Sequence, residues 1–167
     1  MWEPIRNKFE KYPAQEKVVK LLLERGFQVN DAGKVVSGGI EIPHVQIGKE
    51  INVDRRVVDA TAKHIIEDET LFDFFRHVKS IPFLAEVAPH LDLGVVIIIP
   101  DDGAEVGIIS GVTSVIADAG YSIRQTVSDD PYFNEEPRLT IITDHKIPGE
   151  LVDKIREIKG VKGVTIH

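Results

Sequence analysis

The sequence predicts an α+β protein in two parts, with a helical domain and a small hairpin in residues 1–91 and a β-α-β-β-α-β domain in residues 92–167. Apolar residues recur at helical spacing through much of the first half. Residues 93–100, in contrast, form a short apolar run rich in β-branched side chains, which is typical of a buried strand. Charge also differs, with 13 Lys and Arg against 14 Asp and Glu in residues 1–90 and 7 against 13 in residues 91–167.

The first half begins with a stretch that we interpret as a polar leader, followed by a helix over residues 14–25 that Gly26 ends. Short apolar segments flank the turn-forming residues 30–33 and predict a hairpin. The domain boundary is expected near residue 91. The helix before it carries its apolar side chains on one stripe, formed by Leu71, Phe72, Phe75 and Val78.

Two short helical patterns, residues 44–51 and 54–67, are separated by only two residues. Gly48 permits a close helix crossing, Asn52 tolerates a left-handed turn conformation, and Asp54 is suited to cap the second helix. These features predict a helix-turn-helix.

The outward side of this motif carries candidate DNA-binding residues. Arg55 and Arg56 can contact phosphates or guanine edges, and residues on the preceding helix can touch the DNA backbone. A second interpretation stays open, in which Asp59 forms a local salt bridge with this basic pair and the motif packs or binds protein. The candidate DNA-binding set is Gln46, Lys49, Arg55, Arg56 and Lys63.

The second half alternates strands and helices in a regular order. The expected elements are strand 93–99, helix 107–119, strand 121–127, strand 138–143, a helix from Pro148 and strand 161–166. This order is that of the ferredoxin-like split βαβ arrangement, an antiparallel four-stranded sheet with both helices on one face. Its open sheet edges favour a homodimer or a higher homo-oligomer.

The junction between strand 93–99 and helix 107–119 is a candidate site for a small anionic ligand. Free amides and the helix dipole favour a carboxylate there, and Gly107 allows close backbone approach. Asp101 and Asp102 can receive a ligand ammonium group or can simply form a solvated loop. Gly107 itself can be an ordinary helix boundary.

The segment from Gly107 to Ile123, placed directly after a strand, resembles the core signature of ACT domains, which are regulatory modules that bind amino acids or related metabolites. The family usually has Pro before the helix-starting Gly, where this chain has Val106. Carried over to this sequence, the resemblance implies ligand contacts at Val106, Gly107, Ile108, Ile109, Ser122 and Ile123.

The whole chain resembles an archaeal family described as predicted regulators of amino-acid metabolism containing an ACT domain. The segments that carry this resemblance are 12–18, 38–43, 54–60 and 129–133. The resemblance implies a helix-turn-helix domain followed by an ACT domain that senses an amino acid or a similar metabolite.

Nothing in the residues indicates catalysis. The six histidines form no i, i+4 pair and no metal-ligand spacing, and neither a P-loop nor a G-x-S-x-G elbow occurs. Asp101–Asp102 and Asp129–Asp130 can bind a divalent cation, but such pairs usually form only solvated acidic patches. We expect no metal, no cofactor and no enzymatic activity.

The absence of cysteine and of a signal-peptide pattern favours the cytoplasm, and no apolar run is long enough for a membrane span. We therefore expect a regulator that responds to an amino acid or a related small metabolite and that binds duplex DNA. In the alternative, the ACT-like domain mainly dimerises and the helix-turn-helix contacts a protein, as in an adaptor or a regulatory subunit.

Overall fold

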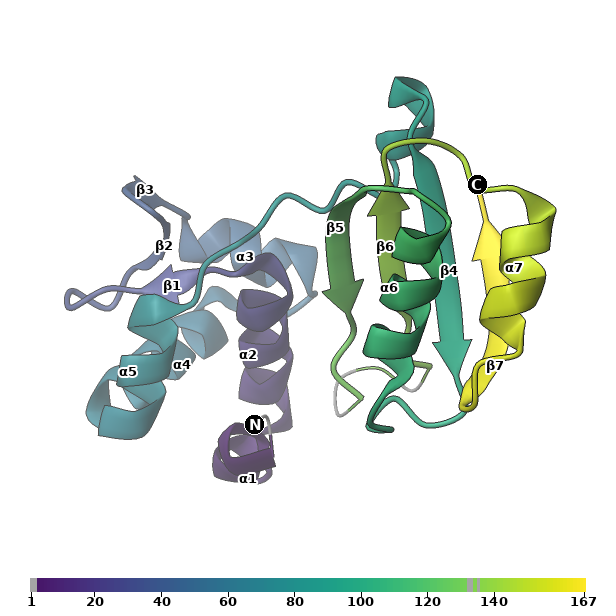
Figure 1. Ribbon diagram of the computed structural model, residues 1–167. Helices are drawn as coiled ribbons and strands as arrows, with labels where there is room; N and C mark the ends of the chain where they lie inside the picture. The colour runs from purple at the N-terminus through teal and green to yellow at the C-terminus, as the bar shows by residue number, and fades with distance from the viewer. Residues whose placement is uncertain (1–2, 132–133, 135) are drawn as a thin grey trace. The chain divides into compact units, whose positions relative to one another are not determined.

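The computed structural model describes residues 3–131, 134 and 136–167. The chain forms two compact units, Met1–Pro82 and Phe83–His167, which we call unit 1 and unit 2 (Figure 1). Among the described residues, no helix combines the length and the apolar character that crossing a membrane requires. The observed architecture confirms the α+β fold class.

Unit 1 is built from five helices and a small antiparallel sheet within the described residues. The helices are α1 (Glu3–Phe9), α2 (Pro13–Arg25), α3 (His44–Glu50), α4 (Arg55–Glu67) and α5 (Glu69–His77). The strands β1 (Gln28–Val29), β2 (Val35–Ser37) and β3 (Ile40–Glu41) pair in sequence order. The core contains fully buried side chains from several helices, among them Phe9, Val18, Leu22, Val58, Ile65 and Phe75.

Two elements of unit 1 differ from the sequence-based prediction. The polar leader is partly helical, because α1 buries Ile5 and Phe9, two apolar side chains one helical turn apart. The hairpin also has a third strand, since β3 pairs with β2 through Ser37 and Ile40. Both elements are short, with seven residues in α1 and two in β3, so their local patterns gave little signal.

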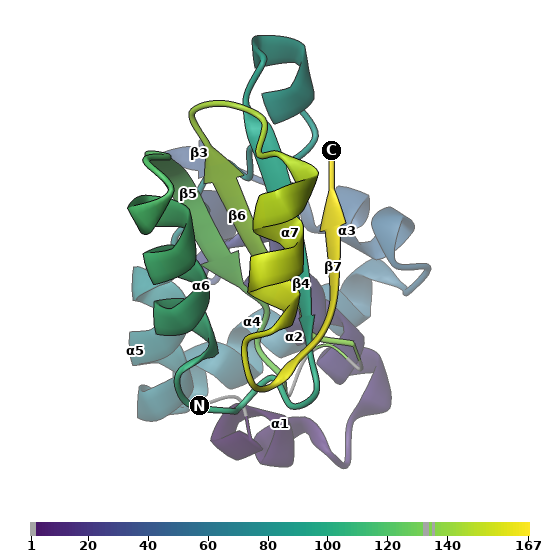
Figure 2. The ribbon, with the colours of Figure 1, turned by 45° about the vertical axis from the view of Figure 1, so that its right-hand side comes forward.

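Unit 2 has the predicted ferredoxin-like topology. Its strands are β4 (Gly94–Pro100), β5 (Ile123–Ser128), β6 (Leu139–Thr143) and β7 (Val161–Ile166), arranged in the antiparallel order β5-β6-β4-β7. Helices α6 (Ile108–Asp118) and α7 (Gly149–Arg156) cover one face of this sheet (Figure 2). Between the helices and the sheet lies a core that includes Val96, Ile98, Val112, Ile116, Ile141 and Ile155.

At one end, the opposite face of the sheet is covered by the segment that precedes β4. Val95 and Ile142 pack with Ala88, which lies in the short 3-10 helix η1 (Ala88–Leu91), and Leu84 and Ala85 add to this cluster. Residues 83–91 therefore pack with unit 2, and the structure divides the chain earlier than the boundary that we predicted near residue 91. The apolar sheet face explains the difference, because it draws the preceding segment onto itself.

Candidate functional site

The turn between α3 and α4 has the features that the sequence predicted. A Cβ atom on Gly48 would lie 2.7 Å from the carbonyl oxygen of Val53, so only glycine permits this approach. Asn52 has a positive φ of 54°, and the Val53 amide donates to the Gly48 carbonyl at 2.8 Å. The two helices therefore meet in the close corner of a helix-turn-helix.

Helix α4 presents one buried and one exposed face. The Asp54 carboxylate caps it by accepting from the Arg56 amide at 2.8 Å. The buried face consists of Val58, Thr61, Ala62 and Ile65. The outward face carries the predicted DNA-binding side chains Arg55, Arg56 and Lys63, all of which are exposed.

Asp59 lies in the middle of this outward face and has two partners. Its Oδ2 accepts from Arg55 Nε at 3.2 Å, and its Oδ1 lies 2.6 Å from His44 Nδ1. The hydrogen bond from His44, with a smaller contribution from Arg55, lowers the pKa of Asp59 below its usual 3.8. The local salt bridge that the sequence offered as an alternative is thus present, whereas Arg56 has no ion-pair partner among the described residues.

His44 connects three elements, and the sequence analysis did not single it out for this role. Its Nε2 accepts from the Val35 amide at 3.3 Å, so the ring proton lies on Nδ1, which donates to Asp59. The ring therefore ties the start of α3 to β2 and to α4. No local pattern marks this arrangement, because its partners are far apart in the chain.

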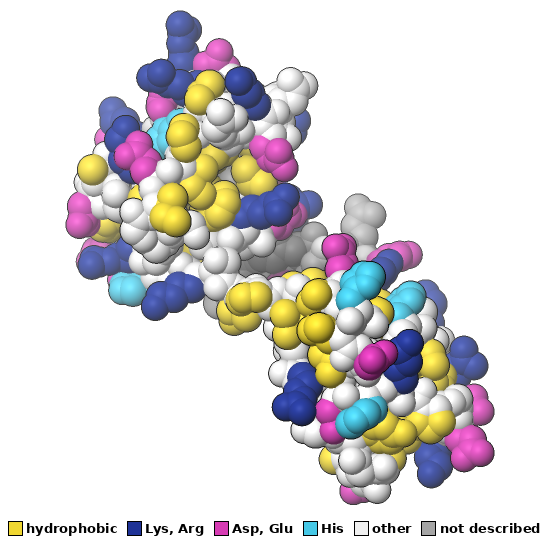
Figure 3. Space-filling view, turned by 90° about the horizontal axis from the view of Figure 1, so that it is seen from above, with side chains coloured by type: hydrophobic (Ala, Val, Ile, Leu, Met, Phe, Trp, Pro, Cys, Tyr) yellow, Lys and Arg dark blue, Asp and Glu magenta, His cyan; other side chains and the backbone are white. Residues whose placement is uncertain are grey.

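The remaining candidates of the DNA-binding set lie on α3. Lys49 is exposed and has no ion-pair partner in the described part of the chain. Gln46 is exposed too, but it lines a groove with Leu21 and Arg25 of α2. Gln46 therefore lies on α3 at the side that meets α2. On the face shown in Figure 3, basic and acidic side chains are interspersed and form no area of one charge.

In unit 2, the loop between β4 and α6 is held by hydrogen bonds within the loop and to Gly160. Asp101 and Asp102 are both exposed. The Asp102 carboxylate accepts from the Ala104 amide at 2.9 Å, and the Asp101 amide donates to the Gly160 carbonyl at 2.9 Å. Asp102 thus shapes the loop locally, as Asp side chains do in turns.

The start of α6 is open. Gly107 is the N-cap residue with a φ of 101°, and no side chain caps the helix. A Cβ on Gly107 would have no neighbour within 4 Å, so its positive φ is what requires glycine here. Val106 is 96% exposed and Ile109 48%, whereas Ile108 is buried at 6%. Of the predicted ligand contacts at this loop, Ile108 is therefore part of the core.

Within one chain, the cavity beside this loop is small. Its volume is about 40 Å³, close to the space of one water molecule and well below that of small-ligand pockets. The sequence analysis missed several of the residues around it, because they come from distant segments: Pro100, Gly103, Glu105, Ser128, Pro137, Arg138 and Leu139.

Ser122 and Ile123 lie at the other end of the sheet from this loop. Ile123 pairs with Thr143, which also pairs with Gly94 at the start of β4. The loop follows the end of β4, at the level of Ser128 and Leu139. The structure therefore does not bring Ser122 and Ile123 together with Gly107 within one chain.

No group of three or more His, Cys, Asp or Glu that could hold a metal ion occurs in the described part of the chain. The Asp129 carboxylate accepts from the Arg138 amide at 3.1 Å and so fixes the neighbouring loop. Of the segment 129–133, which resembles the archaeal family, Tyr132 and Phe133 lie outside the described residues.

The chain matches no family model and no curated protein. Among solved structures it is similar to a transcriptional regulatory protein of the AsnC family from Pyrococcus furiosus, at 13% identity over 92% of this chain and 85% of that chain, with a TM-score of 0.29. It is also similar to an AsnC-family transcriptional regulator from Agrobacterium tumefaciens, at 10% identity over 92% and 86% of the two chains, with a TM-score of 0.27. Both of these solved structures are described as transcriptional regulators.

Proposed function

We propose that this protein is a non-enzymatic transcriptional regulator, in which the helix-turn-helix of unit 1 binds duplex DNA and the ACT-like unit 2 binds an amino acid or a related small metabolite. The proposal rests above all on the α3–α4 corner, with its glycine crossing at Gly48 and the exposed cations of α4. A motif of this shape places its second helix in the major groove of DNA.

The exposed cations of α4 differ in how readily they can bind DNA. Arg55 already donates to Asp59 at 3.2 Å, so a DNA contact would have to compete with that pair. Arg56 has no ion-pair partner among the described residues and is exposed. Its planar guanidinium can contact a phosphate or a guanine edge in bidentate geometry. We therefore assign Arg56 the main contact, with Lys63 and Lys49 contributing to phosphate binding.

The ligand-binding half of the proposal rests on the uncapped start of α6 and on the positive φ of Gly107. The cavity of about 40 Å³ beside it is too small for an amino acid. A second copy of the chain would complete the site, with the segment 122–123 of one copy set against the loop of the other. β5 and β7 are the outermost strands of the sheet that the described residues form, and their outer edges offer surfaces for such a dimer. The ligand then alters DNA binding by favouring one arrangement of the dimer.

Titration of duplex DNA at several salt concentrations tests the DNA-binding half. A regulator of this kind loses affinity with a log-log slope of about −0.9 per phosphate contact. Arg56→Ala should remove most of the affinity. The matched control is Lys17→Ala, which removes an exposed cation from α2. Weak binding that is insensitive to salt and unchanged by Arg56→Ala would contradict DNA binding and favour a protein partner.

A thermal-shift screen of amino acids tests the ligand-binding half. A ligand at 100 times its dissociation constant adds about 2.7 kcal/mol of stability. Gly107→Val should abolish the shift, measured against the melting temperature of the variant itself. Gly149→Ala is the control, because its added Cβ meets nothing within 4 Å and its φ is not positive. A thermal shift that remains in Gly107→Val would show that the ligand binds away from this loop.

A further inference from the structure

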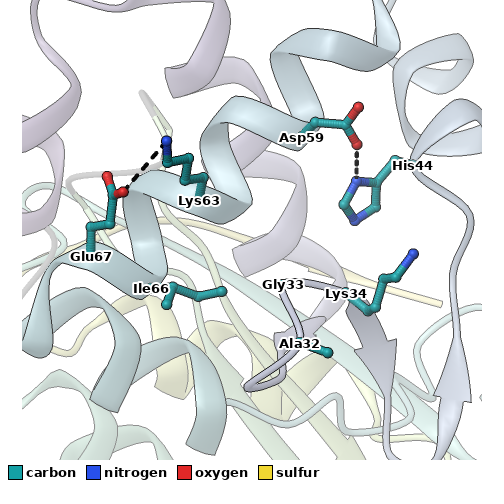
Figure 4. A pocket seen from close by; sticks show the side chains of 8 residues that line it. All are labelled: Ala32, Gly33, Lys34, His44, Asp59, Lys63, Ile66 and Glu67. Atoms are coloured by element: carbon teal, nitrogen blue, oxygen red, sulfur yellow. Dashed lines mark hydrogen bonds and ion pairs between the residues drawn. The ribbon is translucent and has the colours of Figure 1, made fainter.

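A pocket of about 390 Å³ opens in unit 1 between the hairpin turn and α4 (Figure 4). Its volume lies in the range of small-molecule sites. Three segments supply the lining, namely the turn, the start of α3 and the outward side of α4. The lining residues are Ala32, Gly33, Lys34, His44, Asp59, Lys63, Ile66 and Glu67.

The walls of this pocket are held in place by the protein itself. Asn30 Oδ1 accepts from the amides of Ala32 and Lys34 at 3.1 and 3.0 Å, which fixes the turn. A Cβ on Gly33 would lie 3.3 Å from Ile66 Cδ1, so the turn rests closely on α4. The backbone of this turn therefore needs little further ordering when a ligand binds.

The charged groups of the pocket are of both signs. Lys34 and Lys63 bring two ammonium groups, and Asp59 and Glu67 bring two carboxylates. Figure 4 shows Ile66 directed toward Gly33, where it supplies an apolar surface. An anion alone would face the carboxylates and a cation alone would face the ammonium groups, so the best match is a small molecule that carries both charges.

The ion pairs of Lys34, Lys63 and Glu67 leave these three groups available, whereas both carboxylate oxygens of Asp59 are already paired with His44 and Arg55. Lys63 Nζ lies 3.6 Å from Glu67 Oε1, and Lys34 Nζ lies 3.4 Å from Glu41 Oε1. The four side chains of these two pairs are more than half exposed, so solvent screens the pairs and makes them weak. A ligand can therefore exchange them for its own contacts at little cost.

We propose that this pocket binds a zwitterionic molecule of the amino-acid class, with its carboxylate between Lys34 and Lys63, its ammonium group near Glu67, and its side chain against Ile66. This site is separate from the β4–α6 loop of unit 2. A DNA phosphate is a poor occupant, because both carboxylates would repel it.

One consequence rests on the proposed function. Lys63 belongs both to this pocket and to the surface assigned to DNA. A bound zwitterion would therefore occupy Lys63, which could then no longer contact a DNA phosphate, and the ligand would lie on the outward side of α4. Amino acid at saturating concentration should therefore weaken DNA binding and reduce the salt slope by about one phosphate contact. If the chain binds the amino acid but not DNA, the proposed function fails while the pocket assignment stands.

The direct test uses the full chain labelled with ¹⁵N and titrated with each of the twenty L-amino acids at millimolar concentration. We expect amide shifts in residues 32–35 and 59–67 for at least one of them. The deaminated acid and the amide of that amino acid should each bind at least about tenfold more weakly, because each lacks one of the two charges. Shifts confined to residues 103–109 would overturn this inference and support the unit 2 site. Absence of shifts in the pocket residues for all twenty would overturn it as well.

Variants locate the site independently. Lys63→Gln and Glu67→Gln should each weaken binding by about tenfold, the value of one charged hydrogen bond. Ala32→Phe should block the pocket without removing a charge, since Ala32 is exposed in the turn. Lys17→Gln on α2 is the matched control and should leave the affinity unchanged. Undiminished affinity in Lys63→Gln and Ala32→Phe together would overturn the assignment.

Discussion

Unit 1 and unit 2 each contain a candidate ligand site, and the two sites are built differently. At the β4–α6 loop of unit 2, the candidate residues are neighbours in the sequence, and the cavity beside them is about 40 Å³. In unit 1, the pocket of about 390 Å³ is lined by three segments that are separated along the chain. A glycine at a helix start is visible in the sequence but does not by itself create a cavity, whereas packing of a turn on a helix creates one without any motif.

The largest expected effect concerns the separate cores of the two units. Phe75 is fully buried in unit 1, and the main core of unit 2 contains unit 2 residues only. Phe75→Ala should lower the free energy of unfolding of unit 1 by about 3–5 kcal/mol. Urea unfolding, followed by the NMR signals of Ile65 and Ile98, measures each unit by itself. An equal loss in unit 2 would show that the two units unfold as one.

Two glycines with positive φ separate a steric effect from a conformational one. A Cβ on Gly26 would lie 2.3 Å from the backbone nitrogen of Ser80, whereas a Cβ on Gly107 meets nothing within 4 Å. Gly107→Ala should therefore lower the free energy of unfolding only by the cost of placing alanine in the left-handed conformation, about 1–2 kcal/mol. Gly26→Ala should cost clearly more, because the backbone must also shift. Chemical denaturation of both variants gives the comparison, and equal losses would contradict it.

Asp59 gives a smaller effect that depends on pH. In the folded protein, His44 and Arg55 lower the pKa of Asp59 below 3.8, its value in the unfolded chain. The charged carboxylate therefore stabilises the fold at pH values above 3.8. This contribution disappears as the pH falls through the pKa of the folded state. Because Asp59 is 44% exposed, Asp59→Asn should cost about 1 kcal/mol or less at pH 7. The stability difference between Asp59→Asn and the parent should vanish in acid. A difference that stays constant down to pH 2 would exclude this charge effect.

The smallest expected effect is on the stability of Lys63→Gln. Its ion pair with Glu67 is an exposed i, i+4 pair at 3.6 Å, which contributes about 0.3–0.5 kcal/mol. Thermal unfolding of Lys63→Gln should therefore resemble that of the parent. A loss of ligand or DNA binding in this variant would then come from the missing contact. A large destabilisation would show that Lys63 has a structural role and would weaken both proposals.

Much of the local structure follows from a few adjacent residues. Gly48, Asn52 and Asp54 predict the α3–α4 corner, and the structure confirms each of them. The alternating exposure of β5 is likewise present in the sequence pattern. The helix α1 was missed, because its two buried residues lie among polar ones in a short segment.

The candidate sites were predicted less completely than the fold. The exposed cations of α4 were identified from helical spacing alone, and all of them are exposed in the structure. Gln46, predicted to contact the DNA backbone from the preceding helix, is exposed and lines a groove with α2, whereas Ser122 and Ile123 lie at the far end of the sheet from Gly107. Lys34 and His44 were not recognised as neighbours of α4, because the hairpin and the helix approach each other only in the folded chain.

By itself, the sequence determined the helix ends, the turns, the βαββαβ order and the buried stripe of α4, because each depends on the conformational preferences and spacing of residues that are close along the chain. The tertiary structure alone decided that His44 donates to Asp59, that the hairpin turn rests on Ile66, and that mixed charges surround a cavity of about 390 Å³. These contacts join segments distant in sequence, and only the packing of whole elements sets the distances between them.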